Sequence, residues 1–302
     1  MPSYEDALYR LAEEDERIVV MTAENRAAIR TLPERLGPRF IDVGIAEQTL
    51  VGMAAGLALR GRIPVIHALA AFLTQRAFEF IRIDVGIPGL PVKLVGSFPG
   101  FVSEANGPTH QALEDVALMR GIPNMRVFCP ADLDDLLIGL DTVLRDPAPY
   151  YIRFNARSPV VVHSPDFVSG RAEVLAEGRD ATFLTYGVLF SECHQAAERL
   201  RKNGLSIGLV NLRTLKPVDR NRLVALASSC RLLVVVEDHF KTGGLYSILA
   251  ETLLDAGVTA KTLCLSLPDR WFKPALYPAL LEHEGYTPEA LACRVLTRLE
   301  RL

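Results

Sequence analysis

The chain has 302 residues, of which 49% are hydrophobic and 23% are charged, which is typical of a globular protein long enough for two domains. The formal net charge of −3 gives no electrostatic footprint for nucleic acid or for an anionic lipid surface. Five scattered cysteines without a CxxC pair argue against a disulfide framework and against a structural zinc site.

The first sixteen residues contain six acidic side chains and one arginine, a pattern unlike that of a secretory signal. No uninterrupted apolar run approaches the ~18 residues of a membrane span. We therefore expect a cytoplasmic protein with no membrane and no nucleic-acid partner.

Short apolar, β-branched runs alternate with segments of helical periodicity over the first half of the chain. We expect strands at 17–21, 39–43, 62–66, 92–95, 126–128 and 150–154, and helices at 4–12, 47–59, 74–85, 113–120 and 132–144. This alternation predicts a parallel sheet with helices on both faces.

The stretch from 155 to 178 interrupts the alternation with prolines, glycines and charges. Beyond it we expect strands at 181–185, 206–210, 232–236 and 261–265, and helices at 191–203, 219–228, 245–255 and 287–299. The predicted fold is α/β with two doubly wound domains, the first at 1–158 and a smaller second at 179–302, joined by a linker at 159–178.

The segment FIDVGIAEQ, residues 40–48, carries the clearest functional signal. A strand is expected to end at Val43, Gly44 makes a turn, and Glu47 opens a helix, which is the ligand-facing edge of a parallel sheet. An acid at a helix N-terminus also interacts favourably with the helix dipole, by about 0.3–1 kcal/mol. From the spacing alone, both explanations of Glu47 stay open.

FIDVGIAEQ, followed by AAGLALRGRIPV, resembles the pyrimidine-binding domain of thiamine-diphosphate enzymes of the transketolase type. The likeness continues through AAFLTQRAFEFI, GPTHQALEDVALMRGIPNM, VFCPAD and PYYIRFNARSP, and then through LRTLKPVD, VVVEDHFKTGGL and LLEHEGYTPEAL. The resemblance implies a pyrimidine-binding domain at 1–158 and a transketolase C-terminal domain at 179–302.

The resemblance implies that Glu47 is the carboxyl group that activates thiamine diphosphate. A carboxyl bonded to N1′ of the aminopyrimidine favours the imino tautomer, whose 4′-nitrogen takes the proton from thiazolium C2 and leaves a carbanion. The cofactor carries this chemistry, while the protein supplies orientation and electrostatics.

Four further positions follow from the same resemblance. Phe72 is expected against the aminopyrimidine ring, and Arg76 and Ile45 are expected beside the cofactor. His110, in GPTHQ, is expected over the substrate, where a histidine can move a proton at neutral pH. The structural alternatives are core packing for Phe72 and a turn position for His110.

The expected substrate positions depart from the usual transketolase pattern. Asn106 stands where an aspartate is usual, Phe98 where a histidine is usual, and Glu24 where a serine helps to hold phosphate. Arg157 matches a phosphate-contacting arginine and Arg153 is close by, so we expect both beside the substrate, because arginine binds phosphate or carboxylate bidentately. The depleted phosphate set predicts poor activity with ordinary pentose phosphates.

Members of this family hold Mg²⁺ and the diphosphate through a GDG motif, which is absent here. We expect no metal ligand in this chain, and an N-terminal diphosphate-binding partner subunit that ligates Mg²⁺. The resemblance thus implies the C-terminal subunit of a two-component transketolase, in an α2β2 heterotetramer, that passes a two-carbon unit from a ketose-type donor to an aldehyde-type acceptor.

Two alternatives remain open from the sequence. One is another thiamine enzyme subunit, similar to deoxyxylulose-phosphate synthase or to the β-subunit of 2-oxoacid dehydrogenases. The other is a non-catalytic scaffold subunit. In the second domain, Glu237, Asp238 and His239 end an expected strand, where they either meet a ligand or serve the structure.

Overall fold

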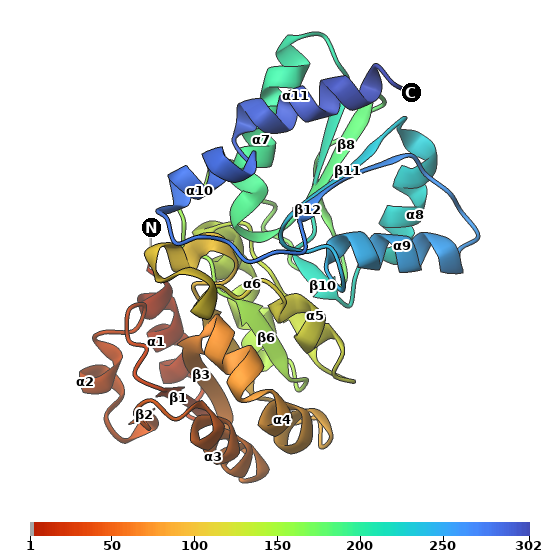
Figure 1. Ribbon diagram of the computed structural model, residues 1–302. Coiled ribbons are helices and arrows are strands. Elements are labelled where there is room, and N and C mark those ends of the chain that lie inside the picture. Colours follow the sequence, from red (N-terminus) through yellow and green to blue (C-terminus); the bar gives the residue numbers. More distant parts are fainter. Residues whose placement is uncertain (1–2) are drawn as a thin grey trace.

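Two sheets, each covered by helices, organise the computed structural model, which describes residues 3–302 (Figure 1). The first sheet has the order β10-β5-β6-β4-β3-β1-β2 and is parallel except for β10. Its strands are β1 (Ile18–Thr22), β2 (Phe40–Asp42), β3 (Ile63–Leu69), β4 (Lys93–Ser97), β5 (Arg126–Phe128), β6 (Tyr150–Arg153) and β10 (Thr214–Lys216).

The helices of the first domain begin where the sequence supplies caps. Ser3 accepts a hydrogen bond from the Asp6 amide before α1, and Asp132 accepts one from the Asp135 amide before α6. The α-helices are α1 (Tyr4–Glu14), α2 (Leu32–Leu36), α3 (Glu47–Leu59), α4 (Phe78–Phe80), α5 (Asp115–Arg120) and α6 (Leu133–Arg145). The short 3₁₀ helices are η1 (Gly37–Arg39) and η4 (Phe101–Thr109).

The helix expected at 74–85 has a different form. Two π-helical stretches, η2 (Phe72–Arg76) and η3 (Ile81–Gly86), flank the single turn of α4. The Ala77 amide donates to the Phe72 carbonyl, which closes the wider i→i+5 turn. Such π turns are rare and often occur at functional sites, and this one sets the positions of Phe72 and Arg76.

The second sheet has the order β12-β11-β8-β9-β7, and only β7 is antiparallel to its neighbour. Its strands are β7 (Glu173–Ala176), β8 (Ala181–Thr185), β9 (Ile207–Asn211), β11 (Leu233–Phe240) and β12 (Thr262–Leu267). The helices are η5 (Gly187–Leu189), α7 (Phe190–Lys202), α8 (Arg220–Ser229), α9 (Leu245–Asp255), α10 (Tyr277–Glu284) and α11 (Pro288–Leu299). In Figure 1, α7 and α11 lie side by side, as do α8 and α9.

The prediction of two α/β domains is confirmed, but the antiparallel edge strands were not predicted. β7 lies within the expected linker 159–178 and pairs with β9 in the second sheet. β10 follows β9 in the chain, yet it pairs with β5 and extends the first sheet. β7 has four residues and β10 has three, so neither strand is long enough to show an alternating hydrophobic pattern in the sequence.

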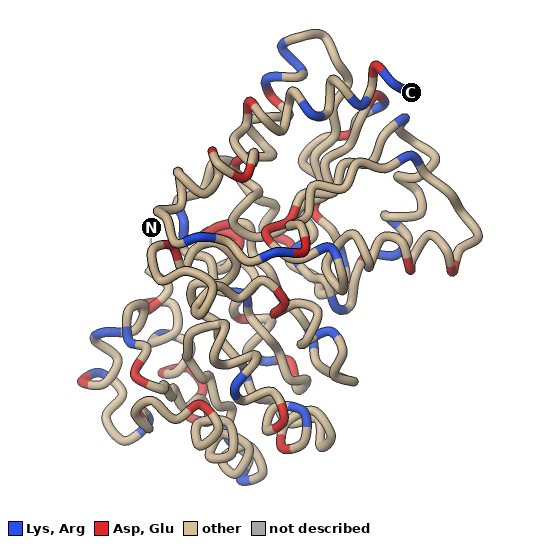
Figure 2. Tube along the Cα trace, in the orientation of Figure 1, with Lys and Arg blue, Asp and Glu red and all other residues tan. Residues whose placement is uncertain are grey.

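Apolar packing continues across the boundary between the domains. One cluster of buried side chains includes Met21 and Leu94 of the first domain together with Val235 and Leu245 of the second. Charges of both signs are interspersed along the trace of both domains (Figure 2). None of the helices described for residues 3–302 combines the length and the apolar character that crossing a bilayer requires.

Candidate active site

Most of the predicted site residues lie in the loops that follow the carboxyl ends of neighbouring parallel strands. Glu47 comes after β2, Phe72 after β3, His110 after β4 and Arg157 after β6. The strands β2, β1, β3, β4 and β6 are consecutive in the first sheet. Ligands of open α/β sheets bind at this edge, because the loops that follow the strands meet there.

The turn that presents Glu47 is organised by Asp42. Its Oδ1 accepts hydrogen bonds from the amides of Gly44 (2.9 Å) and Glu24 (3.2 Å), while Arg26 donates to Oδ2. Burial opposes ionisation of Asp42, but these donors hold the pKa of its carboxyl below the usual value. Gly44 has φ of +70°, which favours glycine, and α3 then begins at Glu47.

Glu47, Arg76, Phe72 and His110 form one continuous chain of contacts. Glu47 is 2% exposed, and its Oε2 accepts a hydrogen bond of 3.0 Å from Arg76 Nη1. The guanidinium carbon of Arg76 lies 4.3 Å from the centre of the Phe72 ring, and Phe72 meets His110 edge-to-face at 5.0 Å. Residues from three loops that are distant in the sequence thus meet at one place.

This arrangement fits the pyrimidine half of the expected cofactor. No residue of the described chain other than Arg76 donates a hydrogen bond to the Glu47 carboxyl, so Oε1 can bind a ring nitrogen. Phe72 offers an aromatic surface beside Arg76, which donates to that carboxyl. Ile45, in the turn before α3, is 71% exposed and has room for contact with a ligand or another chain.

A cavity of about 490 Å³ opens between the start of α1 and the loops that follow β1, β4 and β6, and two of the predicted substrate residues, Phe98 and Arg157, line it. Phe98 is 39% exposed and has φ of +54°. The guanidinium carbon of Arg157 lies 4.2 Å from the centre of the Tyr277 ring. Tyr4 and Arg30 also line the cavity.

Arg30 was not predicted from the sequence. It follows the carboxyl end of β1 by eight residues and adds a second guanidinium to the cavity wall. The sequence offered one indication of this role, which is the position of Arg30 in the loop after a central strand, but no motif accompanies the residue. Glu24, which was aligned with a phosphate-contacting serine, lines a separate surface hollow with Arg26, Asp42 and Gly44.

Asn106 and His110 lie on the segment that joins β4 to α5, outside the lining of that cavity. Asn106 donates to the Ser103 carbonyl (3.2 Å), which leaves its own side-chain oxygen free of partners in the described chain. The Thr109 hydroxyl lies 2.9 Å from His110 Nδ1. The Ser103 hydroxyl lies 2.6 Å from the His110 carbonyl oxygen and steadies the backbone of that residue.

The expected substrate contact of Arg153 is corrected by the structure. Arg153 is 1% exposed, and its Nε donates to Asp115 (3.0 Å) while Nη1 donates to Asp238 (2.7 Å). Its charge is therefore neutralised inside the protein, between the two domains. The ion pair could not be predicted from the local sequence RFNAR, because Asp238 is 85 residues away in the chain.

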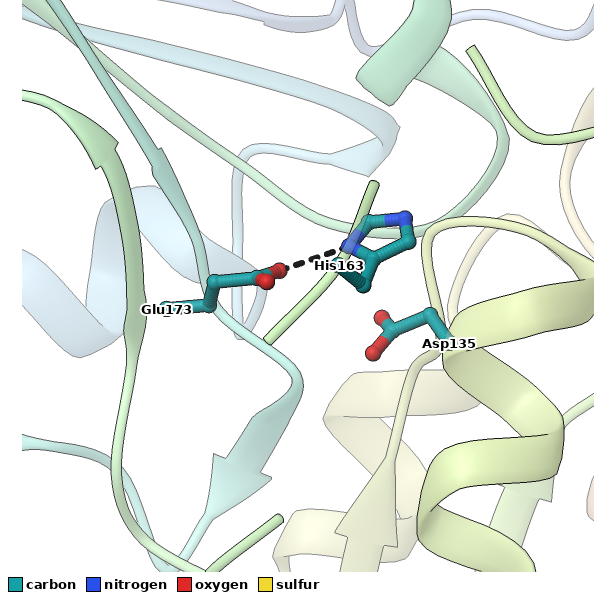
Figure 3. A group of neighbouring side chains, drawn as sticks. All are labelled: Asp135, His163 and Glu173. Atoms are coloured by element: carbon teal, nitrogen blue, oxygen red, sulfur yellow. Dashed lines mark hydrogen bonds and ion pairs between the residues drawn. The ribbon is translucent and has the colours of Figure 1, made fainter. Parts of the chain in front are cut away.

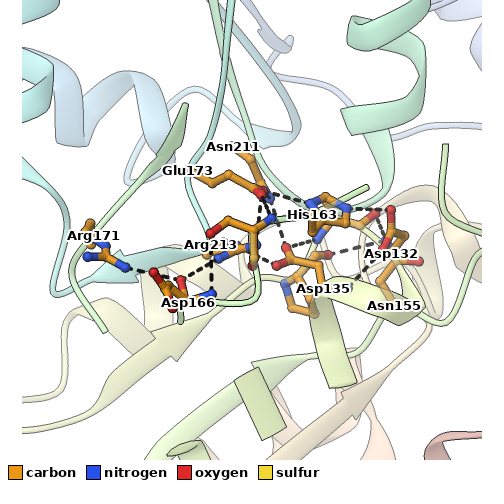
Figure 4. Close-up of polar contacts among 12 residues, drawn as sticks. Asp132, Asp135, Asn155, His163, Asp166, Arg171, Glu173, Asn211 and Arg213 are labelled. Carbon is orange, nitrogen blue, oxygen red and sulfur yellow. Dashed lines mark hydrogen bonds and ion pairs between the residues drawn. The ribbon is translucent and has the colours of Figure 1, made fainter. Parts of the chain in front are cut away.

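A second polar cluster lies where the domains meet (Figure 4). His163 is hydrogen-bonded to Asp132 through Nε2 and to Glu173 through Nδ1, both at 2.8 Å. Asp135, His163 and Glu173 are close enough together to suggest a metal site (Figure 3). Arg213, however, lies 2.6 Å from Asp135 and 2.9 Å from Glu173, so a guanidinium already serves as the cation there.

Replacing His163 with glutamine is expected to destabilise the protein by about 3 kcal/mol, since the buried Asp132 carboxylate loses its cationic partner and Glu173 loses one of two. Burial opposes protonation, but the hydrogen bonds to Asp132 and Glu173 raise the pKa of His163 from 6.5 to about 10. The imidazole of His163 thus binds its proton more tightly in the folded state than in the unfolded state. The stabilisation is complete below pH 6.5 and declines as the pH rises towards 10.

Urea unfolding of the wild type and of His163→Gln at pH 6, 8 and 9.5 measures this effect. The difference between the two proteins should shrink as the pH rises. His283→Gln, at an exposed histidine, is the matched control. A difference that stays constant or grows over this range would contradict the charged state of His163.

The comparisons with known proteins agree with this geometry. Residues 2–159 match the family described as "Transketolase, pyrimidine binding domain", and residues 170–291 match "Transketolase, C-terminal domain". The chain is 32% identical over 304 residues to a "Putative transketolase C-terminal section" of Methanocaldococcus jannaschii, covering 99% of this chain and 95% of the relative. It is 38% identical over 255 residues to the "6-deoxy-6-sulfo-D-fructose transketolase subunit SqwH" of Clostridium sp. (strain MSTE9), covering 83% and 79%.

Solved structures give the same result. The structure titled "Split gene transketolase, inactive beta4 tetramer" superposes with a TM-score of 0.88 at 35% identity, covering 98% of this chain and 97% of the other. A Pichia stipitis transketolase shares the fold, with a TM-score of 0.79 at 18% identity over 45% of its length. The chain also spans about half the length of 1-deoxy-D-xylulose-5-phosphate synthases, such as that of Synechococcus sp. (strain JA-2-3B'a(2-13)), at 37% identity. The chain belongs to the transketolase family of thiamine-diphosphate-dependent transferases, in which it corresponds to the C-terminal section that joins a pyrimidine-binding domain to a C-terminal domain.

Proposed function

We propose that this chain is the pyrimidine-binding subunit of a two-component transketolase, which moves a two-carbon ketol unit from a ketose-type donor to an aldehyde-type acceptor. The observation that carries the proposal is the buried Glu47 carboxyl, which has one oxygen without a partner in the described chain and is linked through Arg76 to Phe72 and His110. Thiamine diphosphate supplies, when bound, the activated carbon at which a carbon–carbon bond next to a carbonyl is broken and formed.

The residues of this chain bind the cofactor and transfer protons to and from the substrate. Glu47 holds a ring nitrogen of the aminopyrimidine by a hydrogen bond, and its burial keeps water away from that contact. Phe72 packs against the ring, while Arg76 balances the buried charge of Glu47. His110, in contact with Phe72, is the group that can give or take a proton at a substrate oxygen.

A partner subunit is proposed to complete the site. Large apolar side chains are exposed on and beside α3, the helix that begins with Glu47; they are Ile45, Met53, Phe80, Ile83 and Ile87. Exposed apolar residues gathered around one element are typical of a protein interface. We propose that a diphosphate-binding subunit, which ligates Mg²⁺, covers this surface in an α2β2 heterotetramer.

Co-expression with a GDG-bearing transketolase N-terminal subunit from the same genome tests the assignment. The purified complex should convert ketose donors and aldehyde acceptors, as followed by mass spectrometry, and its mass should equal two copies of each chain. Turnover of pyruvate with release of CO₂, and no use of ketoses, would instead support a function like that of 1-deoxy-D-xylulose-5-phosphate synthase. A complex without either activity would favour a scaffold subunit.

The cavity that contains Phe98 is proposed to hold the far end of the substrate. Arg30 and Arg157 give this cavity two cationic groups, whereas Phe98 gives part of its wall an apolar surface. We propose that the two arginines bind a terminal anionic group, and that Asn106 bonds a donor hydroxyl. One relative is named for a sulfonated sugar, so sulfonate is a candidate beside phosphate.

Arg30→Ala and Arg157→Ala are each expected to lower kcat/KM for an anionic donor by about 10- to 100-fold, since a hydrogen bond to a charged group contributes ~1.5–3 kcal/mol. The measurement compares 6-deoxy-6-sulfofructose, xylulose 5-phosphate and an uncharged ketose in the reconstituted complex. The uncharged ketose should be affected little. Arg179→Ala, at an exposed arginine in the second domain, is the control. Equal losses for charged and uncharged donors would exclude recognition of an anionic terminus by these arginines.

A further inference from the structure

The segment from Phe98 to His110 is held in place largely by the second domain. It leaves the end of β4, contains η4, and delivers His110 to the site. Four of its residues have positive φ: Phe98, Gly100, Glu104 and Gly107. A non-glycine residue rarely adopts this conformation without support from its surroundings, so the contacts that hold the segment determine where His110 lies.

The first of these contacts is a buried ion pair with the second domain. Asp238, in β11, binds Arg153 of β6, and the backbone of Gly100 rests directly on this pair. A methyl group on Gly100 would lie 1.7 Å from Asp238 Oδ2 and 2.7 Å from Arg153 Nη2. The start of the segment is therefore fixed against a charge that the C-terminal domain provides.

The second contact is aromatic. Phe101 is fully buried, and its ring meets Phe272 at 5.2 Å and Tyr286 at 6.2 Å, both edge-to-face. These partners belong to the second domain, so a residue of the first domain is anchored in the core of the second. Two residues later, the Ser103 hydroxyl reaches the His110 carbonyl.

The third contact lies at the other end of η4. Gly107, with φ of +70°, rests against Pro274, because a methyl group there would lie 2.6 Å from Pro274 Cγ. The amides of His110 and Gln111 then both donate to the Gly107 carbonyl. The backbone turn before His110 thus depends on Gly107, and the 268–276 segment of the second domain packs against that glycine.

We propose that Asp238 and Phe272 are positioning residues for His110, through which the C-terminal domain sets the substrate-facing side of the active site. Their neighbour Glu237 serves the structure alone: it accepts hydrogen bonds from the amides of Leu245 and Tyr246 at the start of α9. The effect on catalysis rests on the proposed role of His110, but the contacts that hold the segment can be tested without it.

The test uses Phe272→Leu, with Asp238→Asn as a second variant, in the complex with the diphosphate-binding subunit. Both should lower kcat roughly tenfold, because a misplaced catalytic group has a large effect on rate. The affinity for thiamine diphosphate, measured by calorimetry, should stay the same, since Glu47 and Phe72 lie on other loops. Phe183→Leu, in β8 of the same core, is the matched control.

A double-mutant cycle with His110→Ala distinguishes positioning from general loosening of the fold. In the His110→Ala background, Phe272→Leu should have little further effect on kcat. Full retention of its effect there, or an equal loss in Phe183→Leu, would overturn the proposal.

Hydrogen exchange of the isolated chain provides a readout that needs no activity. Peptides that cover residues 101–110 should exchange faster in Phe272→Leu than in the wild type, and not in Phe183→Leu. Unchanged exchange would overturn the proposal even if activity fell. An inactive wild-type complex would contradict the proposed function instead, and the exchange data would still decide whether the second domain holds the segment.

Discussion

Replacing Glu47 with glutamine is expected to lower kcat of the reconstituted complex at least hundredfold, about 2.7 kcal/mol in barrier height. Glutamine keeps the volume of the side chain and can still accept from Arg76, so the fold and the partner interface should persist. What it loses is the acidic oxygen that can share a proton with a ring nitrogen. The loss should therefore appear in kcat rather than in the amount of complex formed.

Three measurements make this result specific. Circular dichroism and the mass of the complex check the fold and the assembly, and steady-state kinetics give kcat and KM. Glu282→Gln, at an exposed position of α10, is the control and should be active. A loss smaller than tenfold in Glu47→Gln would mean that this carboxyl is not the activating acid, whereas a loss of assembly would point to a structural role.

The prediction from sequence succeeded where the information is local. Glu47 opens a helix directly after a strand, and the limits of α3 were predicted without error. Parallel strands place their carboxyl ends at one edge, so a residue that follows a strand can be assigned to the site before any contact is known. The contacts that join Glu47, Phe72 and His110 follow this rule.

The features that were not predicted have a common physical reason: each depends on contacts between residues that are far apart in the sequence. Arg153 looks like a ligand-binding arginine from its neighbours alone, but Asp115 and Asp238 bind it inside the protein. The π-helical turn at Phe72 and the edge strand β10 depend in the same way on tertiary packing. Arg30 belongs to the cavity only because α1 and the loop after β1 come together there.

The isolated chain of 302 residues is expected to bind thiamine diphosphate at least hundredfold more weakly than the complex does, which corresponds to about 2.7 kcal/mol. In the proposed site, Glu47 and Phe72 would contact only the pyrimidine ring of the cofactor. The sequence has no GDG motif to hold Mg²⁺ and the diphosphate. A diphosphate carries several negative charges, and binding them needs a cation or several donors.

Calorimetric titration with Mg²⁺ present compares the chain alone, the partner alone and the complex. The complex of the partner with Glu47→Gln is the control, because it should lose turnover while keeping most of the affinity that the diphosphate provides. Micromolar affinity of the chain alone would contradict the division of the site between two subunits. Tight binding by the complex and by neither chain alone would show that the pyrimidine and diphosphate contacts act together, since linking two weak contacts in one ligand makes the second binding event intramolecular.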